Sequence, residues 1–237
     1  MALKETVETL DIDTVSIVLP PIMEEFETKE KILDGVKVLF MKYGIRSVTM
    51  DDIARHLAIS KKTLYQHFAD KDDLIYKMSE SFLERAFKRY QEIAERAKNS
   101  IEELRLISGC MKEDMEHINP SVLFDLEKYH PKAWNLWVEH KTKVIEKSVI
   151  RNIHKGIADG YFRAEIQPEV AAITRLILLE SAFDSRVFPH NKFNLAEVQL
   201  QLFDFFVHGL CTEKGKKLYQ KYKENAQLTK QSNEAIL

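Results

Sequence analysis

Cysteine is nearly absent from this sequence: only Cys110 and Cys211 occur in 237 residues, and they are far apart. Two such cysteines exclude a disulfide framework and a cysteine-rich zinc site. Glycine and proline are also scarce, at 7 and 6 residues, well below average usages of about 7% and 5%. So few turn-forming residues argue against a many-stranded β-sandwich and favour long helices.

Long apolar runs and an excess of one charge are missing too. No stretch reaches the roughly 18 consecutive apolar residues of a membrane span, and Met1–Leu10 lacks the apolar run of a secretory signal. The formal net charge is −2, which excludes a uniformly basic surface but leaves room for a local basic patch. With 45% apolar residues, the chain has enough for a packed core. We therefore expect a cytoplasmic, helical protein.

The charge is unevenly distributed along the chain. Residues 1–27 carry a net charge of −6, residues 28–78 carry +3, and residues 79–237 carry +1. A basic segment thus lies near the amino end of a slightly acidic protein, although a small excess of this kind also fits an ordinary solvated surface.

Apolar residues recur at three- and four-residue spacing along most of the chain, which predicts an all-α fold. Caps and breakers set the expected boundaries: Thr28 caps the first helix, Gly44 ends it, and Thr212 caps the last. The helices are expected at 28–43, 50–56, 61–68, 71–99, 100–117, 120–126, 132–159, 169–188, 195–210 and 213–225.

The segment Thr49–Phe68 has the pattern of a helix-turn-helix. Thr49, Ser60 and Asp70 are placed to cap three successive helices. Ala54 is small where two short helices must cross, and the turn at 57–59 has the usual three residues. Ala58 stands where glycine is common, so a positive φ there costs about 1 kcal/mol. The positions expected to pack the pair on the first helix are Ile53, Leu57, Ile59 and Leu64.

Polar side chains are left on the outer face of the third short helix. Lys61, Lys62, Thr63, Tyr65, Gln66 and His67 supply donors, positive charge and an aromatic ring. The amino end of such a helix enters the major groove, where base edges differ in their hydrogen-bonding pattern. The amino ends at Thr49 and Lys71 are placed to hold phosphates. A lone lysine pair is usually just solvated, but the caps, the small Ala54, the apolar set and the basic face together indicate DNA binding.

These residues resemble a known family. Val48–Ala54 and the run Leu64-Tyr65-Gln66-His67-Phe68-Ala69-Asp70-Lys71-Asp72-Asp73-Leu74 look like the DNA-binding domain of TetR family transcriptional regulators. The resemblance covers roughly residues 28–76; beyond it only helix pattern and length are similar. It implies a homodimeric, all-helical regulator, usually a repressor relieved by a small molecule. It also implies DNA contacts at Thr28, Thr49, Lys61, Lys62, Thr63, Tyr65, His67 and Lys71.

The expected organisation follows from these features. Residues 1–22 are expected to be a flexible extension, 23–75 an N-terminal three-helix helix-turn-helix DNA-binding domain, 76–228 a larger helical ligand-binding and dimerisation domain, and 229–237 a flexible tail. Helices 169–188 and 195–210 carry broad apolar stripes that fit a four-helix dimer core, although they would also fit a monomer core.

The sequence gives less information about the effector site than about the DNA-binding domain. Ligand sites in helical bundles are apolar cavities, and the candidate lining residues are Phe124, Tyr129, Trp134, Trp137, Phe162 and Phe183. Each also fits a plain core position. No metal or other cofactor is expected, because the histidines are scattered without a carboxylate or cysteine at zinc-ligand spacing. Cys110 and Cys211 are expected to be buried thiols.

Two other classes remain as alternatives. An enzyme would need a nucleophile–base pair, a glycine-rich phosphate loop or paired carboxylates, and none stands out. A helical adaptor that binds protein and not DNA is the other alternative. The expected partners are therefore a double-stranded DNA operator, a second copy of the chain and an unidentified small-molecule effector.

Overall fold

The computed structural model describes residues 21–116 and 118–234, and within them side chains from 27 to 225. The described chain is almost entirely helical, in agreement with the all-α prediction. The amino-terminal elements are α1 (Pro21–Tyr43), α2 (Met50–His56), α3 (Lys61–His67) and α4 (Lys71–Arg96). They are followed by α5 (Ser100–Met115), α6 (Val122–Tyr129), α7 (Pro131–His140), η2 (Lys141–Ile145), α8 (Glu146–Ala158), α9 (Pro168–Ser181), α10 (Leu195–Leu210) and α11 (Glu213–Glu234).

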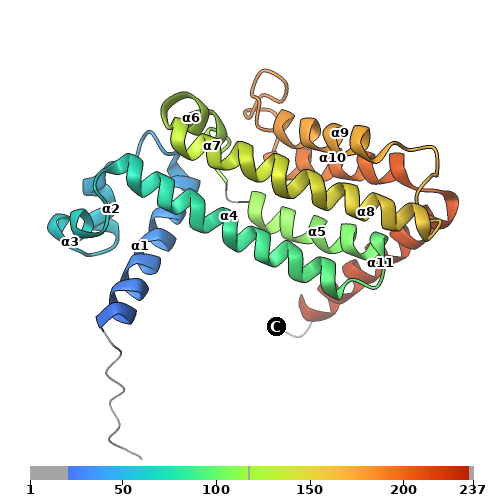
Figure 1. The fold of residues 1–237 in the computed structure, drawn as a ribbon, viewed down its shortest axis with the longest axis horizontal. Coiled ribbons are helices and arrows are strands. Elements are labelled where there is room, and N and C mark those ends of the chain that lie inside the picture. Colours follow the sequence, from blue (N-terminus) through green and yellow to red (C-terminus); the bar gives the residue numbers. More distant parts are fainter. Residues whose placement is uncertain (1–20, 117, 235–237) are drawn as a thin grey trace, which may run out of the picture.

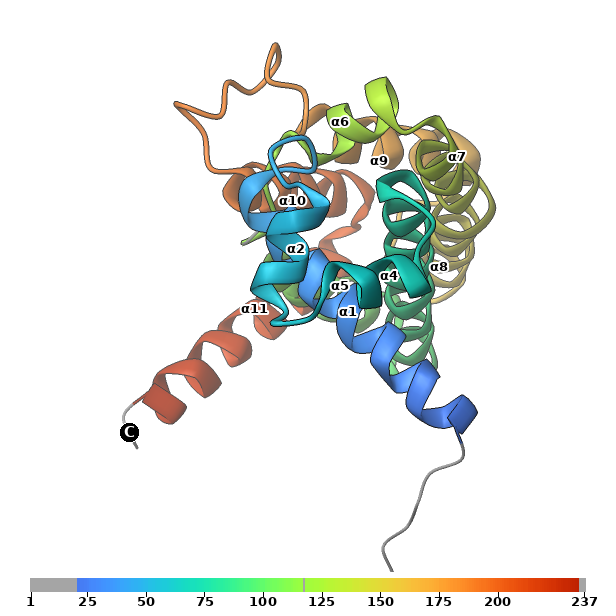
Figure 2. The same ribbon diagram turned by 90° about the vertical axis from the view of Figure 1, so that its left-hand side faces the viewer.

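The molecule is elongated, with the short helices α2 and α3 at one end (Figure 1). Helix α4 runs from that end along the body, beside α5 and α7. Turning the molecule brings the α2–α3 end to the front, and α1 and α11 then diverge in different directions (Figure 2). Because α4 takes part in both halves, it connects the small amino-terminal domain to the larger bundle.

Three apolar clusters form the interior. The first joins α1–α4 and also contains Val122, Leu126 and Ala133 from α6 and α7. The second is the centre of the larger bundle and draws on α5, α8, α10 and α11. A smaller third cluster surrounds Ala182, Leu195 and Val198. Helix α6 therefore packs on the amino-terminal domain, although it follows α5 in sequence.

Several boundaries differ from the sequence expectation. Helix α1 begins at Pro21, so Thr28 lies inside it and does not cap it. Residues 21–22 were expected in a flexible extension but are helical; residues 1–20 lie outside the described residues. Helix α9 ends at Ser181, seven residues early, because the amides of Phe183 and Asp184 turn back to the carbonyls of Glu180 and Ser181.

Two further differences concern the second half of the chain. The predicted long helix 132–159 contains a π-helical turn, in which the Glu146 amide bonds to the Lys141 carbonyl. Helix α11 continues to Glu234, past the residue 228 boundary of the expected tail; residues 235–237 lie outside the described part.

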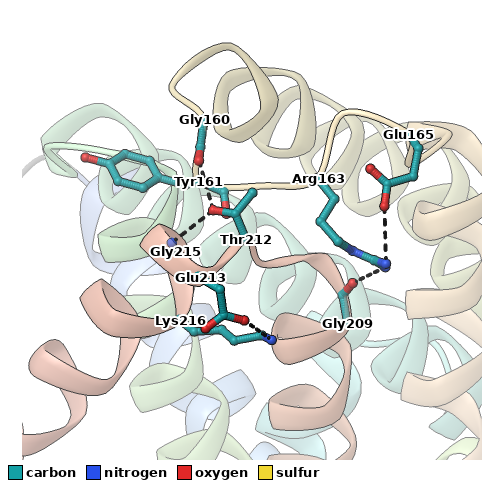
Figure 3. Close-up of polar contacts among 9 residues, drawn as sticks. All are labelled: Gly160, Tyr161, Arg163, Glu165, Gly209, Thr212, Glu213, Gly215 and Lys216. Atoms are coloured by element: carbon teal, nitrogen blue, oxygen red, sulfur yellow. Dashed lines mark hydrogen bonds and ion pairs between the residues drawn. The ribbon is translucent and has the colours of Figure 1, made fainter.

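The start of α11 is held by a loop from the end of α8 (Figure 3). The Thr212 hydroxyl donates to the Gly160 carbonyl at 2.9 Å and accepts from the Gly215 amide at 3.2 Å. Thr212 is thus the predicted cap. Gly160 has φ +70°, a conformation that favours glycine, and its carbonyl faces this cap. The Arg163 amide donates to the Leu210 carbonyl, so the loop also fixes the end of α10.

Candidate nucleic-acid interface

Helix α2 begins in a reciprocal capping box. The Thr49 side chain accepts the Asp52 amide at 3.2 Å, and the Asp52 carboxylate accepts the Thr49 amide at 3.0 Å. The Thr49 hydroxyl also donates to the Asp52 carboxylate at 2.6 Å, and this bond, together with the one from the Thr49 amide, holds the pKa of Asp52 below its ordinary value. A cap of this kind satisfies two amides that the helix leaves free. It fixes the direction in which α2 enters the domain.

The turn between α2 and α3 is closed by backbone alone. Ala58 has φ +52°, the left-handed conformation that lets the Ile59 amide reach the Ala54 carbonyl at 3.0 Å. Ala54 is buried, as a small residue at a helix crossing must be. The two helices are therefore joined by the three-residue turn, Leu57 to Ile59, that was predicted.

Helix α3 has one inward and one outward side. Ser60 caps it by accepting the Thr63 amide at 3.0 Å. Leu64 is fully buried and packs with the first apolar cluster. Lys61, Lys62, Tyr65 and Gln66 are exposed. Because α3 lies at the tip of the molecule, this outward side faces solvent (Figure 1).

The two lysines of α3 differ in how their charge is used. Lys61 forms an ion pair with Asp51 at 2.6 Å, and this contact raises its pKa. Lys62 makes no hydrogen bond or ion pair with any residue in the described ranges. Lys62 is therefore the more available cation on this surface, a difference that the sequence did not reveal.

Three other residues predicted to contact DNA have half-buried side chains. Thr63 is half-buried, with its hydroxyl 2.8 Å from that of Ser60. His67 is half-buried beside the Phe68 ring. Thr28 is half-buried on α1.

Lys71 points into the domain. Its ammonium donates to the Ile45 carbonyl at 2.7 Å and lies over the Phe40 ring. Burial lowers its pKa. The expected side-chain contact with phosphate would require this bond to open. The first turn of α4, capped by Asp70 through the Asp73 amide, still presents backbone amides there.

Helix α6 and the residues just before and after it are bonded to the amino-terminal domain at three points. Asp125 is buried and accepts the Arg46 amide at 3.4 Å. The Asn119 amide donates to the Met41 carbonyl at 2.6 Å. The His130 ring nitrogen lies 2.7 Å from the Asp72 carboxylate at the start of α4. A displacement of α6 would therefore be felt at both ends of the helix-turn-helix.

The six aromatic candidates for the effector site do not line one cavity. Phe124 and Tyr129 are exposed on α6. Trp134 packs on the first cluster, Phe162 is buried in the second, and Phe183 borders the third. Trp137 is half-buried, with its indole nitrogen 3.4 Å from Glu180. Amphipathic spacing shows which helix face is apolar but not which faces meet.

A pocket of about 640 Å³ lies between α1, α4 and α5. Its walls combine apolar side chains with lysines and acids, which are Lys37, Val38, Met41, Lys42, Phe82, Glu113, Asp114, Ile118, Asn119 and Pro120. Lys37 lies over the Phe82 ring, and burial lowers its pKa. None of the six aromatic candidates belongs to this pocket.

The apolar stripes of helices 169–188 and 195–210, which were predicted to form a dimer core, contain both buried and exposed side chains. Six of the stripe residues are buried within the monomer: Ala182, Leu195, Val198, Phe203, Phe206 and Leu210. Four large apolar side chains remain 50–68% exposed: Val170, Ile173 and Ile177 on α9 and Phe205 on α10. The two helices contact each other, and these four side chains are the apolar face that they leave open to solvent.

No helix in the described ranges is long and apolar enough to cross a membrane. Within the same ranges, no three histidine, cysteine or acidic side chains are grouped to hold a metal ion.

The fold and the α2–α3 surface define a helix-turn-helix DNA-binding regulator with a separate helical domain. Comparison with known proteins supports this class. Residues 25–78 match the family model for bacterial regulatory proteins of the TetR family. The HTH-type transcriptional repressor KstR2 of Mycobacterium tuberculosis is 27% identical over 147 residues, which cover 59% of this chain and 72% of the relative.

Solved structures share the architecture. The KstR2 structure from Mycobacterium tuberculosis matches with a TM-score of 0.56 at 21% identity, covering 78% of this chain and 96% of that one. A TetR family regulator from Agrobacterium tumefaciens matches with a TM-score of 0.66 at 18% identity, covering 79% and 100%. The amino-terminal domain thus matches the TetR family of bacterial regulatory proteins, and the fold of the chain resembles that of solved TetR family regulators.

Proposed function

We propose that this regulator is a repressor that binds a two-fold symmetric operator through α3. The observation that carries the proposal is the outward side of α3, where Lys62 and Tyr65 are exposed while Leu64 anchors the helix in the core. Side chains placed in this way reach base edges and phosphates in the major groove. Such a protein works in the compartment that holds the DNA, the cytoplasm of a bacterial cell.

The dimer in this proposal forms through α9 and α10. Their exposed apolar face offers what an obligate interface needs, since residues such as Ile177 and Phe205 gain most by leaving water. A two-fold interface uses the same face on both copies. It would present two α3 helices to two half-sites about one helical turn apart or a multiple of it.

Release from DNA would be coupled to a ligand in the larger domain. Helix α4 is shared by both domains, and α6 with its flanking residues Asn119 and His130 is bonded to Arg46, Met41 and Asp72 of the DNA-binding end. A ligand that favours a different position of α4 or α6 would change the spacing of the two α3 helices. It would then select the conformation that binds DNA poorly.

The test is a gel shift with promoter DNA taken from beside the protein's own gene. The wild-type protein is expected to retard this DNA at low salt. Lys62→Ala is expected to weaken binding roughly a hundredfold, since each dimer loses two charge-assisted contacts of about 1.5 kcal/mol each. It is also expected to flatten the salt dependence by about one unit per protomer.

The matched control is Lys147→Ala, which removes the same charge from an exposed position on α8, away from α3. It is expected to leave affinity and salt slope unchanged. No retardation by the wild-type protein at low salt would reject the proposal. Equal effects of the two substitutions would reject the assignment of Lys62.

A further inference from the structure

Arg175 is a buried cation without an acidic partner. It lies on α9, is 5% exposed, and its guanidinium carbon is 5.0 Å from the centroid of the Phe203 ring. One terminal nitrogen, Nη2, is 3.2 Å from the Met111 sulfur. The other, Nη1, has no hydrogen-bond partner among the described residues. Burial lowers the pKa of Arg175 to about 10.

Such an arrangement is costly, because a charge taken out of water needs an opposite charge or several hydrogen bonds. Two acids of α5, the helix that carries Met111, are paired with other arginines. Asp114 on α5 pairs with Arg89 and accepts the Tyr90 hydroxyl at 3.3 Å. Glu103 pairs with Arg151. A thioether and an aromatic ring are weak substitutes for a carboxylate.

A second unsatisfied group lies on the same pair of helices. Gln199 is fully buried on α10, one helical turn before Phe203. Its amide nitrogen donates to the Leu179 carbonyl at 2.6 Å, and Leu179 follows Arg175 by one turn of α9. The Gln199 oxygen has no partner among the described residues. Two polar atoms one helical turn apart between α9 and α10 therefore have no partner among the described residues. The Nη1 of Arg175 is a donor, and the side-chain oxygen of Gln199 is an acceptor.

We propose that Arg175 binds the carboxylate of an effector that has an otherwise apolar body. This inference rests on the proposed function, because it names the chemical class of the ligand that the regulator senses. A guanidinium matches a carboxylate with two parallel hydrogen bonds. The side chains around it, Met111 and Phe203, suit hydrocarbon, and the Gln199 oxygen can accept one hydrogen bond from the ligand.

The charge balance favours a singly charged acid over a phosphate. Arg175 supplies one positive charge, and Arg89, a half-buried arginine of α4, is already neutralised by Asp114. A phosphate would bring nearly two negative charges to a site where the described residues offer a single unpaired positive charge, that of Arg175. Met111, which Arg175 contacts, belongs to α5, and α5 packs against α4. A carboxylate bound at Arg175 would therefore lie one helix away from α4, the helix that leads to the DNA-binding end.

The experiment measures binding of three acids to the full chain by calorimetry: hexanoate, decanoate and 3-phenylpropanoate. The matching primary alcohols are measured in parallel. At least one acid is expected to bind the wild-type protein saturably and about 10- to 100-fold more tightly than its alcohol. Arg175→Met is expected to remove that preference. The control Arg186→Met, at an exposed arginine after α9, is expected to keep it.

Thermal unfolding separates a ligand-binding arginine from a structural one. Without ligand, Arg175→Met is expected to unfold at the same or a higher temperature, because an unmatched charge leaves the interior. A lower melting temperature, combined with equal acid binding by both proteins, would overturn the proposal. So would acids that fail to bind the wild-type protein or bind no better than their alcohols, a comparison that does not depend on the variant folding.

A gel shift with the bound acid keeps the two proposals apart. Acid binding that depends on Arg175 but leaves the DNA complex unchanged supports the site and contradicts its regulatory role. A DNA complex that forms normally with a protein that binds none of the acids overturns the site and leaves the regulator intact.

Discussion

At the residue scale, Ala58 carries a local strain that the sequence already signalled. Its φ of +52° places a Cβ where the left-handed region costs about 1–2 kcal/mol. We predict that Ala58→Gly stabilises the protein by up to about 1 kcal/mol, because relief of this strain exceeds the added freedom of the unfolded chain. Denaturant unfolding of both proteins measures the difference.

The control is the same substitution where the backbone is helical. Ala86→Gly lies in the interior of α4 and is expected to destabilise by about 1 kcal/mol. The two changes should therefore have opposite signs. A loss of stability at both positions would show that the turn is not strained.

Single residues also mark the limit of sequence reasoning. Thr49, Ser60 and Thr212 cap helices as predicted, because a cap depends only on residues three positions away. The partner of Lys71 is a carbonyl 26 residues earlier, which no local pattern reveals. Arg175 escaped notice although it interrupts the buried side of α9; a charged residue within an apolar stripe was the signal.

At the element scale, helix ends that depend on local caps were predicted correctly, whereas an end that depends on tertiary contacts was not. Helices α2 and α10 have the predicted ends, since both have clear amino-terminal caps. The end of α9 was missed because the chain turns at Ala182, where Phe183 and Phe188 pack on the third cluster. Periodicity continued past that point in the sequence, but tertiary contacts decided the outcome.

The packing of α8 against the following loop gives a prediction at this scale. A Cβ at Gly156 would lie 2.0 Å from the Phe162 ring, and that ring is buried. Gly156→Ala is therefore expected to destabilise by about 1–3 kcal/mol, since neither helix nor ring can move freely. Thermal and denaturant unfolding provide the measurement.

Gly109 on α5 is the matched position, because a Cβ there meets nothing within 4 Å. Gly109→Ala should stabilise by about 0.5–1 kcal/mol through helix propensity alone. If Gly156→Ala were equally stabilising, Phe162 would not be packed on α8 as described.

At the scale of the whole molecule, the sequence predicted the class of architecture but not how the helix faces meet. The amino-terminal domain followed from about fifty residues with local signatures. The six aromatic candidates are dispersed because helix period says nothing about which helices become neighbours. The pocket between α1, α4 and α5 is lined by segments that are distant in sequence and come together only when the chain folds, so no sequence motif predicted it.

The exposed face of α9 and α10 yields the last prediction. Phe205 is 68% exposed, and in a two-fold dimer its substitution would act twice across one interface. Phe205→Glu places an unpaired charge in that interface, so the protein is expected to sediment as a monomer of 27.7 kDa where the wild type sediments at twice that mass.

Phe87→Glu makes the same change at an exposed position on α4 and should leave the dimer intact. Operator binding should fall with dimerisation, because a monomer has one α3 helix and contacts a single half-site. A Phe205→Glu protein that still sediments as a dimer would place the interface elsewhere. The two α3 helices would then have to reach their half-sites through a different two-fold axis.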